Sequence, residues 1–371
     1  MSRILRVVLI IFLFFGSAVS RPVISQILKD TAAIRILKNG VDAVYNFRFE
    51  EAWEASGKLS SLYPDHPVNH LFSGMITYWE NYPLKPGSKA QITYVSHMER
   101  CIAICEEREE TDDYPEYLLS NLGARGMLLL FYADNNLSNN VFPLVKTTYR
   151  YIRQSFDYTS FYDDFYFFTG LYNYYREAYP EARPVYKVLA FLFPRGDKAK
   201  GLTEMQTAAQ KSLMLRAEAY TFLSHIYIHF ENNYQVAYAY SNSLNRLYPG
   251  NLLYRASKIK NLLLIKWYDE AEQLIESGSG NTGNRFFEAQ VTIYKGILQE
   301  KKYRNLKLAK QYYNRGFSEI TPFGYFGNET AALACFGLSR IYDIEGDKDN
   351  KKTYRKMALD LTSYKKVSFD D

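Results

Sequence analysis

From about residue 30 onward, hydrophobic side chains recur every three or four positions, and polar side chains fill the positions between them. In one stretch the recurring residues are Leu213, Ala217, Tyr220, Leu223, Tyr227 and Phe230. This spacing draws one apolar stripe along an α-helix, whereas the alternating patterns typical of β-strands are almost absent. The sequence therefore predicts an all-α protein.

Short groups of turn-forming residues separate the predicted helices. They lie at residues 64–67, 134–136, 249–251, 278–283 and 346–347, and they are rich in Gly, Pro, Asn and Asp. These residue types favour tight turns for distinct stereochemical reasons. Because the breaks are short, neighbouring helices are expected to pack as antiparallel pairs.

Small residues recur with a period of 34. Gly40 and Gly74 are 34 residues apart, and Ala237 and Ala271 have the same separation. Pro249 follows Ala237 by twelve residues. A small residue lets two helices approach closely, and a proline ends the second helix of a pair. One pair alone cannot bury its apolar face, so several pairs must stack.

This period, with a small residue in each helix and a proline after the second, resembles the tetratricopeptide repeat. Further positions that carry the pattern are Ala52, Pro64, Gly296, Ala309, Gly337 and Ala358. The resemblance implies a right-handed superhelix of antiparallel helix pairs. It also implies a single domain over residues 21–371, built from about seven to eight pairs.

The middle of the chain carries a second resemblance, over roughly residues 160–250. It is similar to bacterial exported tetratricopeptide proteins and to the inclusion-body-clearance family of tetratricopeptide proteins. The similar residues are those at 170–175, Pro180, those at 193–202, Ala208 and Ala209. This resemblance implies an adaptor-like role without catalysis, and it leaves the partner open.

The first 20 residues have the pattern of a secretory signal peptide. Arg3 and Arg6 precede an apolar run at 7–15, and Ala18 and Ser20 supply the small residues of a cleavage site. The run is shorter than the ~20 residues needed to span a bilayer. We expect export to the periplasm or cell envelope of a Gram-negative bacterium. An uncleaved anchor is the alternative, because residues 23–28 extend the apolar stretch.

Charge and cysteine content narrow the function classes. Lys and Arg total 45 against 40 Asp and Glu, a net charge of +5 that is well mixed along the chain. This small excess argues against nucleic acid as the partner. Three cysteines are too few for a disulfide scaffold, and Cys101 and Cys105 are expected to be small core residues on one helix face.

Local motifs for catalysis or cofactor binding lack their required context. The glycines at 278, 280 and 283 match a dinucleotide fingerprint, but no strand precedes them. His225 and His229 would share a helix face, yet they lack a third metal ligand and the glutamate of a zinc hydrolase. Asp163 and Asp164 are adjacent and would diverge on a helix. We therefore expect no enzyme, no metal and no cofactor.

The predicted binding site is the concave groove, lined by the first helix of each repeat. Its early wall would consist of Ile34, Leu37, Val68, Leu71, Met75 and Tyr78. The later wall would consist of Phe222, Ile226, His229 and Lys260. The expected occupant is a protein or peptide partner with an apolar stripe. The alternative is that another part of the same chain fills the early groove.

Two further surfaces suggest other ligands. The aromatic residues around 161–175 fit a module that binds a glycan or lipid, or else a wide core between repeats. Basic residues gather near the carboxyl end, at Lys348, Lys351, Lys352, Arg355, Lys356, Lys365 and Lys366. They fit the polar face of a capping helix, with peripheral contact to membrane headgroups as the alternative. A third hypothesis is an enzyme whose site is assembled from distant residues.

Overall fold

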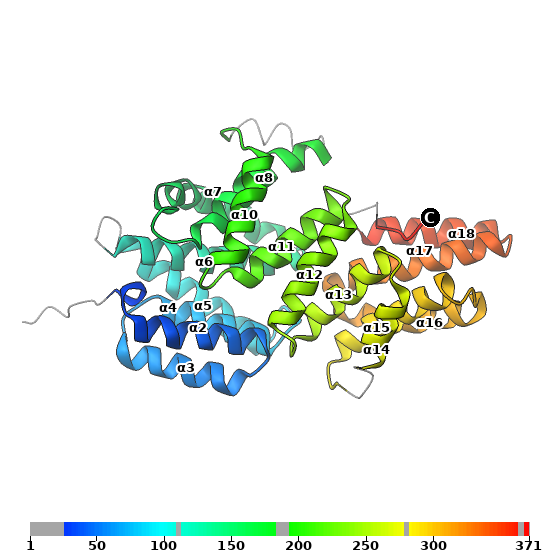
Figure 1. Cartoon of the computed structure of the whole chain (residues 1–371), viewed down its shortest axis with the longest axis horizontal. Helices are drawn as coiled ribbons and strands as arrows, with labels where there is room; N and C mark the ends of the chain where they lie inside the picture. Colours follow the sequence, from blue (N-terminus) through cyan, green and yellow to red (C-terminus); the bar gives the residue numbers. More distant parts are fainter. Residues whose placement is uncertain (1–25, 109–112, 183–192, 278–281, 363–366, 371) are drawn as a thin grey trace, which may run out of the picture.

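The computed structural model describes residues 26–108, 113–182, 193–277, 282–362 and 367–370 of the chain (Figure 1). These residues form α-helices and short 3₁₀ segments, with no β-strand in the described ranges. The all-α prediction is confirmed. The predicted signal peptide, Gly278, Gly280, Lys365 and Lys366 lie outside the described residues. No helix in the described ranges combines the length and apolarity needed to cross a membrane.

Consecutive helices pack in antiparallel pairs, as a helical-repeat solenoid requires (Figure 1). The first pairs are α2 (Thr31–Tyr45) with α3 (Phe49–Leu62), α4 (Val68–Glu80) with α5 (Lys89–Glu106), α6 (Tyr114–Asp134) with α7 (Ser138–Ser155), and α8 (Phe165–Ala182) with α10 (Lys198–Lys211). The later pairs are α11 (Arg216–His229) with α12 (Tyr234–Leu247), α13 (Leu252–Leu264) with α14 (Tyr268–Glu276), α15 (Arg285–Lys301) with α16 (Leu306–Ile320), and α17 (Asn328–Ile344) with α18 (Lys348–Leu361). The short segments are η1 (Ile27–Lys29), η2 (Phe156–Tyr158) and η4 (Thr321–Gly327).

The small residues that set the period lie where helices touch. The periodic alanines of the second helices are fully buried: Ala52, Ala237, Ala271, Ala309 and Ala358. A Cβ atom added to Gly40 would lie only 2.5 Å from Cζ of Phe72. At Gly201 it would lie 2.6 Å from the backbone nitrogen of Tyr174, so the backbones of α8 and α10 are in direct contact. A larger side chain at these positions would push the helices apart.

The turns inside six of the pairs share one backbone conformation. In each, a residue with positive φ stands two positions before the second helix begins. These residues are Phe47, Asn136, Asn232, Lys266, Arg304 and Gly346, with φ between 53° and 76°. One of the six is glycine and two are Asn, which tolerate this conformation, so three of the six turns impose it on residues that disfavour it.

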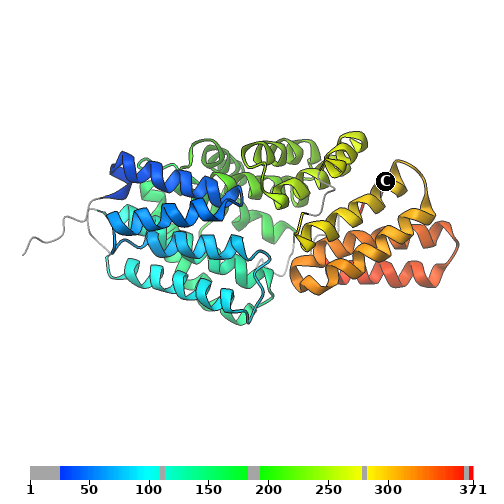
Figure 2. The same ribbon diagram turned by 90° about the horizontal axis from the view of Figure 1, so that it is seen from below.

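The solenoid folds back so that its first helix lies beside α12 and α13 (Figures 1 and 2). Val41 of α2 belongs to the same buried cluster as Leu244 and Tyr254. A ring contact adds to the contact between early and late helices. The ring centroid of Trp79, at the end of α4, lies 6.0 Å from that of Tyr254 on α13. The inner face of the early helices is therefore covered by later helices of the same chain.

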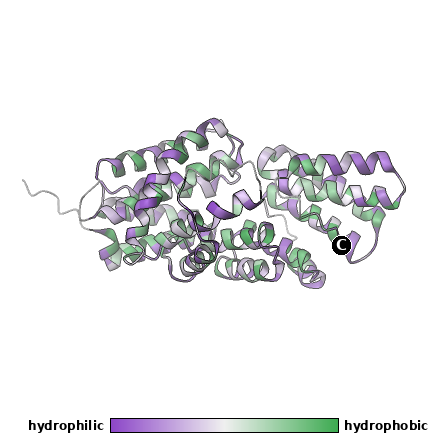
Figure 3. Cartoon of the chain, turned by 90° about the horizontal axis from the view of Figure 1, so that it is seen from above, coloured by the Kyte–Doolittle hydropathy of each residue, from purple (hydrophilic) through white to green (hydrophobic). Residues whose placement is uncertain are grey.

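The carboxyl-terminal end of the molecule has a strongly polar outer helix. Figure 3 shows hydrophilic residues concentrated along α18, the outermost helix at that end, while α17 beneath it is largely apolar. Only Ala358 of α18 is fully buried. This arrangement fits a terminal helix that covers the last apolar face of a repeat array.

Candidate binding surfaces

The early wall of the predicted groove is core rather than open surface. Leu37, Leu71, Met75 and Tyr78 are all buried, with exposed fractions between 1% and 7%. Met214, from the segment between α10 and α11, packs against both clusters that contain them. The prediction that these side chains line an accessible groove is therefore wrong for this structure. The alternative, that another part of the chain fills the early groove, describes what is observed.

Three residues of the later wall are also engaged inside the molecule. Phe222 is half-buried, and its ring centroid lies 5.6 Å from that of Phe167 on α8. His229 and Lys260 converge on the carboxylate of Glu329, at the start of α17. The distances to its Oε1 are 3.3 Å from His229 Nε2 and 3.2 Å from Lys260 Nζ. Glu329 thus ties α11 and α13 to α17.

Burial and neighbouring charges shift the pKa values of four residues in this cluster. Burial raises the pKa of Glu329, but Lys260 and His229 outweigh it and hold the pKa well below its usual range. Burial lowers the pKa of His229, and it lowers that of the neighbouring His225 to about 3. Burial and the charge of Glu329 raise the pKa of Asp134, at the end of α6, to about 7. At neutral pH both imidazoles of the cluster are therefore uncharged, and Asp134 is about half ionised.

From the sequence we expected no metal site at His225 and His229. The two rings are close, with centroids 4.4 Å apart. Within the described ranges, no group of three or more His, Cys, Asp or Glu residues has the geometry to hold a metal ion. Sequence reasoning did not identify Glu329 and Asp134 as members of this cluster, because they are distant from it in the chain. Glu329 follows His229 by 100 residues, and Asp134 precedes His229 by 95.

The aromatic region around 161–175 is mainly a core. Phe165, Phe168 and Tyr174 are buried against α10 and α11, whereas Phe161 is 67% exposed. The faces of these three buried rings already contact other side chains, so they are not available to a ligand. The interpretation as a wide core between repeats describes the buried rings.

Three other residues considered in the sequence analysis, Asp164, Cys101 and Cys105, have structural roles. Asp164 is buried, and its carboxylate accepts hydrogen bonds from the backbone N–H groups of residues 213–215, at 2.8–2.9 Å. It caps the turn that precedes α11. Cys101 and Cys105 are buried thiols without a disulfide, as expected for small core residues.

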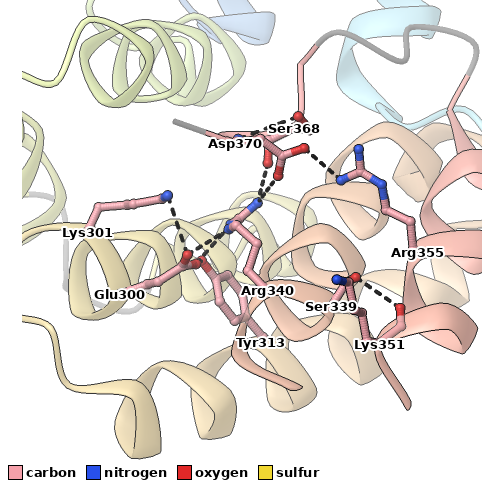
Figure 4. A network of polar contacts seen from close by, with 9 residues as sticks. All are labelled: Glu300, Lys301, Tyr313, Ser339, Arg340, Lys351, Arg355, Ser368 and Asp370. Carbon is pink, nitrogen blue, oxygen red and sulfur yellow. Dashed lines mark hydrogen bonds and ion pairs between the residues drawn. The ribbon is translucent and has the colours of Figure 1, made fainter. Parts of the chain in front are cut away.

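A network of charged side chains joins the carboxyl-terminal helices (Figure 4). Arg340 on α17 donates to both oxygens of Glu300 on α15, at 2.7 and 2.8 Å, and the Tyr313 hydroxyl donates to the same carboxylate at 2.6 Å. Arg340 also donates to the carbonyl oxygen of Ser368 and, at 3.2 Å, to Asp370. The tail at 367–370 is thereby fixed against α17.

The outer side of α18 carries a second charged feature, which we call the lysine stripe. Lys348, Lys352 and Lys356 are exposed and lie four residues apart on one helix face. None of their ammonium groups forms an ion pair or hydrogen bond with the residues that the structure describes. The adjacent Lys351 differs, because its Nζ lies 2.7 Å from Asp343.

The lysine stripe borders a shallow hollow of about 590 Å³. Its lining residues are Lys351, Lys352, Arg355, Lys356, Leu359 and Asp360. Arg355 is partly neutralised, because Asp370 of the tail lies 2.7 Å from its Nη1. We use the term α18 basic face for Lys348, Lys351, Lys352, Arg355 and Lys356 together. The basic composition of this segment was visible in the sequence, but the sequence could not show which of these residues form ion pairs.

The fold defines an all-α helical-repeat protein. No protein-family model matches the sequence. No curated protein matches it either.

Proposed function

We propose that this protein is a non-enzymatic scaffold of tetratricopeptide type that binds a protein partner through the α18 basic face. The observation that carries the proposal is the lysine stripe, three exposed cations that form no ion pair with the residues that the structure describes, beside a hollow of about 590 Å³. The interior groove expected from the repeat pattern is filled by the chain itself. An outer surface is therefore the better candidate for a partner.

The lysine stripe contrasts with other lysines of the chain, which are paired. Lys310 lies 2.7 Å from Glu345, and Lys302 lies 2.6 Å from both Asp269 and Glu272. Like charges four residues apart destabilise a helix slightly. Lys348 also stands in the first turn of α18, where the helix dipole disfavours a cation. A partner that supplies negative charge would relieve both effects.

Site-specific photo-crosslinking in cells tests the proposal. A photo-reactive amino acid at position 352 should give a discrete adduct with another protein. The same residue at position 58 serves as the matched control. Lys58 is an exposed lysine on α3 that is paired with Glu54 at 2.6 Å. Adducts at 352 and not at 58 support the proposal. Equal labelling at both positions, or none at 348, 352 and 356, would contradict it.

We also propose that the scaffold acts in the periplasm or cell envelope, which rests on the signal-like pattern of residues 1–20. Expression of the full chain in a Gram-negative host, followed by mass spectrometry of its amino terminus, tests this. A mature chain beginning near Arg21 supports cleavage and export. An intact amino terminus in the membrane fraction indicates the uncleaved anchor, and an intact chain in the cytosol contradicts export.

A further inference from the structure

We infer that the α18 basic face binds an acidic peptide segment of its partner, and that the chain's own Asp370 competes for this surface. The inference rests on the proposed function and names the chemistry of the partner.

The lysine stripe is narrow and linear. Lys348 and Lys356 are eight residues apart, which corresponds to about 12 Å along the helix axis. Arg355 and Lys351 run beside the stripe and line the same hollow. A peptide with several carboxylates over a similar length can meet these cations in sequence. Each exposed pair contributes little alone, so recognition requires several at once.

The tail already shows how a carboxylate sits on this surface. Asp370 Oδ2 lies 2.7 Å from Arg355 Nη1, and its Oδ1 lies 3.2 Å from Arg340 Nη1. The tail is anchored by Val367, which is buried in the core cluster of α15 and α17. Asp370 is therefore held close to Arg355 at a high effective concentration. An incoming carboxylate must share Arg355 or displace Asp370 from it.

The flanking residues favour a narrow acidic peptide over a broad anionic membrane. Asp349 and Asp360 are exposed on α18 beside the stripe. Asp343 and Glu345 stand at the nearby end of α17 and its turn. A flat bilayer surface would bring anionic headgroups against these carboxylates as well as against the lysines, which costs electrostatic energy. A single peptide segment can follow the stripe and avoid them.

Fluorescence anisotropy with a fluorescein-labelled hexaglutamate peptide tests the inference at low salt. The full chain should bind the peptide, and added salt should weaken binding. The double variant Lys352→Glu and Lys356→Glu should weaken it by at least about tenfold. The matched control Lys38→Glu and Lys58→Glu changes the net charge equally at the opposite end, and binding should stay within about twofold. Circular dichroism of each variant checks its folding.

The Asp370→Asn variant tests the competition. Removing this carboxylate frees Arg355, so the peptide should bind several-fold more tightly than it binds the parent chain. Equal binding to both would overturn the competition and leave the acidic segment in place. Vesicles containing phosphatidylserine form a separate arm. Binding to vesicles without binding to the peptide would overturn the acidic segment in favour of a membrane surface.

The failure of this inference is distinguishable from failure of the proposed function. Loss of peptide binding with persistent crosslinking at position 352 would show a partner that is not recognised through acidic residues. Loss of both would remove the α18 basic face as a binding surface. Peptide binding that the Lys352→Glu and Lys356→Glu variant leaves unchanged would place the acidic site elsewhere on the chain.

Discussion

The side-chain amide of Asn251 donates a hydrogen bond to the backbone carbonyl oxygen of Tyr45, 206 residues earlier in the chain, at 3.1 Å. Asn251 is fully buried, and its Oδ1 also accepts the N–H groups of Leu253 and Tyr254, which caps α13. One side chain thus orders the start of a late helix and joins it to the end of the first helix. We call the contact of α2 with α12 and α13 the closure, because it covers the inner face of the early helices. The bond from Asn251 to Tyr45 is part of this closure.

Replacing Asn251 with Asp should destabilise the protein. Asp keeps the oxygen that caps α13, but it sets a second oxygen against the Tyr45 carbonyl in place of the donor. We expect a loss of about 2–3 kcal/mol in the free energy of unfolding, measured with urea. Asn305→Asp is the control, because Asn305 caps α16 through Oδ1 at an exposed site. A loss of equal size in both variants would contradict the closure bond.

A second prediction concerns Glu218, which faces the same closure and accepts a hydrogen bond from the Tyr45 hydroxyl. Burial raises the pKa of Glu218 to about 8 from an ordinary 4.5, and its Oε2 is buried without a hydrogen bond in the described part of the chain. The unfolded chain releases this proton near pH 4.5, but the folded chain holds it to about pH 8. The raised pKa of Glu218 therefore lowers the free energy of unfolding progressively as the pH rises from about 4.5 to about 8.

The Glu218→Gln variant should remove that loss. Its stability relative to the parent should increase as the pH rises from 5 to 8 and level off above that, with a total gain of about 4 kcal/mol between pH 5 and the plateau. Urea unfolding of both proteins across this range gives the difference directly, and groups that titrate in both proteins cancel. A difference independent of pH would show that Glu218 is ionised in the folded protein at low pH.

The repeat architecture could be predicted from the sequence because it depends on local spacing. Ala237 and Ala271 are 34 residues apart, and both are buried at helix contacts. Helical periodicity and short turns report on neighbours in the chain, so they were sufficient for the all-α fold. The same reasoning identified Cys101 and Cys105 as core residues.

The closure and the charged clusters could not be predicted in this way. Whether α2 meets α13 depends on the rotation accumulated over several helix pairs, and no local pattern records it. This is why Leu37 and Met75 were expected on an open wall but are buried. His229 and Lys260 were expected on the later wall of the groove, yet the carboxylate that joins them, Glu329, comes from a helix far along the chain.

The repeated turn geometry leads to a third prediction. Lys266 has a φ of 63° and an exposed side chain between α13 and α14. A residue with a Cβ atom is strained in this conformation, by roughly 1 kcal/mol, whereas glycine is not. Lys266→Gly should therefore stabilise the protein or leave it unchanged, despite the added flexibility of the unfolded chain.

Lys58 supplies the contrast for this substitution. It is exposed within α3, where glycine should destabilise the protein by about 1 kcal/mol. Thermal unfolding of the two variants should therefore move the melting temperature in opposite directions, or lower it only for Lys58→Gly. A similar decrease in both would show that the turn before α14 does not require a positive φ in solution.

The fourth prediction concerns the bidentate pair of Arg340 and Glu300. The side chain of Glu300 is only 6% exposed, and Arg340 holds the pKa of this carboxyl below its ordinary value although burial raises it. Arg340→Met would leave the buried carboxylate with the Tyr313 hydroxyl, at 2.6 Å, and the more distant Lys301 Nζ, at 3.5 Å, as its partners. Breaking a buried pair in this way should cost about 3 kcal/mol, whereas the exposed pair of Arg315 and Glu319 should lose less than about 1 kcal/mol in Arg315→Met.

A second substitution separates the pair from the general packing of Arg340. In Arg340→Met the Glu300 carboxylate keeps only Lys301, at 3.5 Å, as a cationic partner. Glu300→Gln combined with Arg340→Met removes this poorly compensated charge, so the double variant should be more stable than Arg340→Met alone. Urea unfolding of the single variants, the double variant and the parent gives the coupling energy. Additive effects would show that Arg340 stabilises the fold through its contacts with the tail and its packing. A coupling of about 1 kcal/mol or more would show that neutralisation of Glu300 is its main contribution.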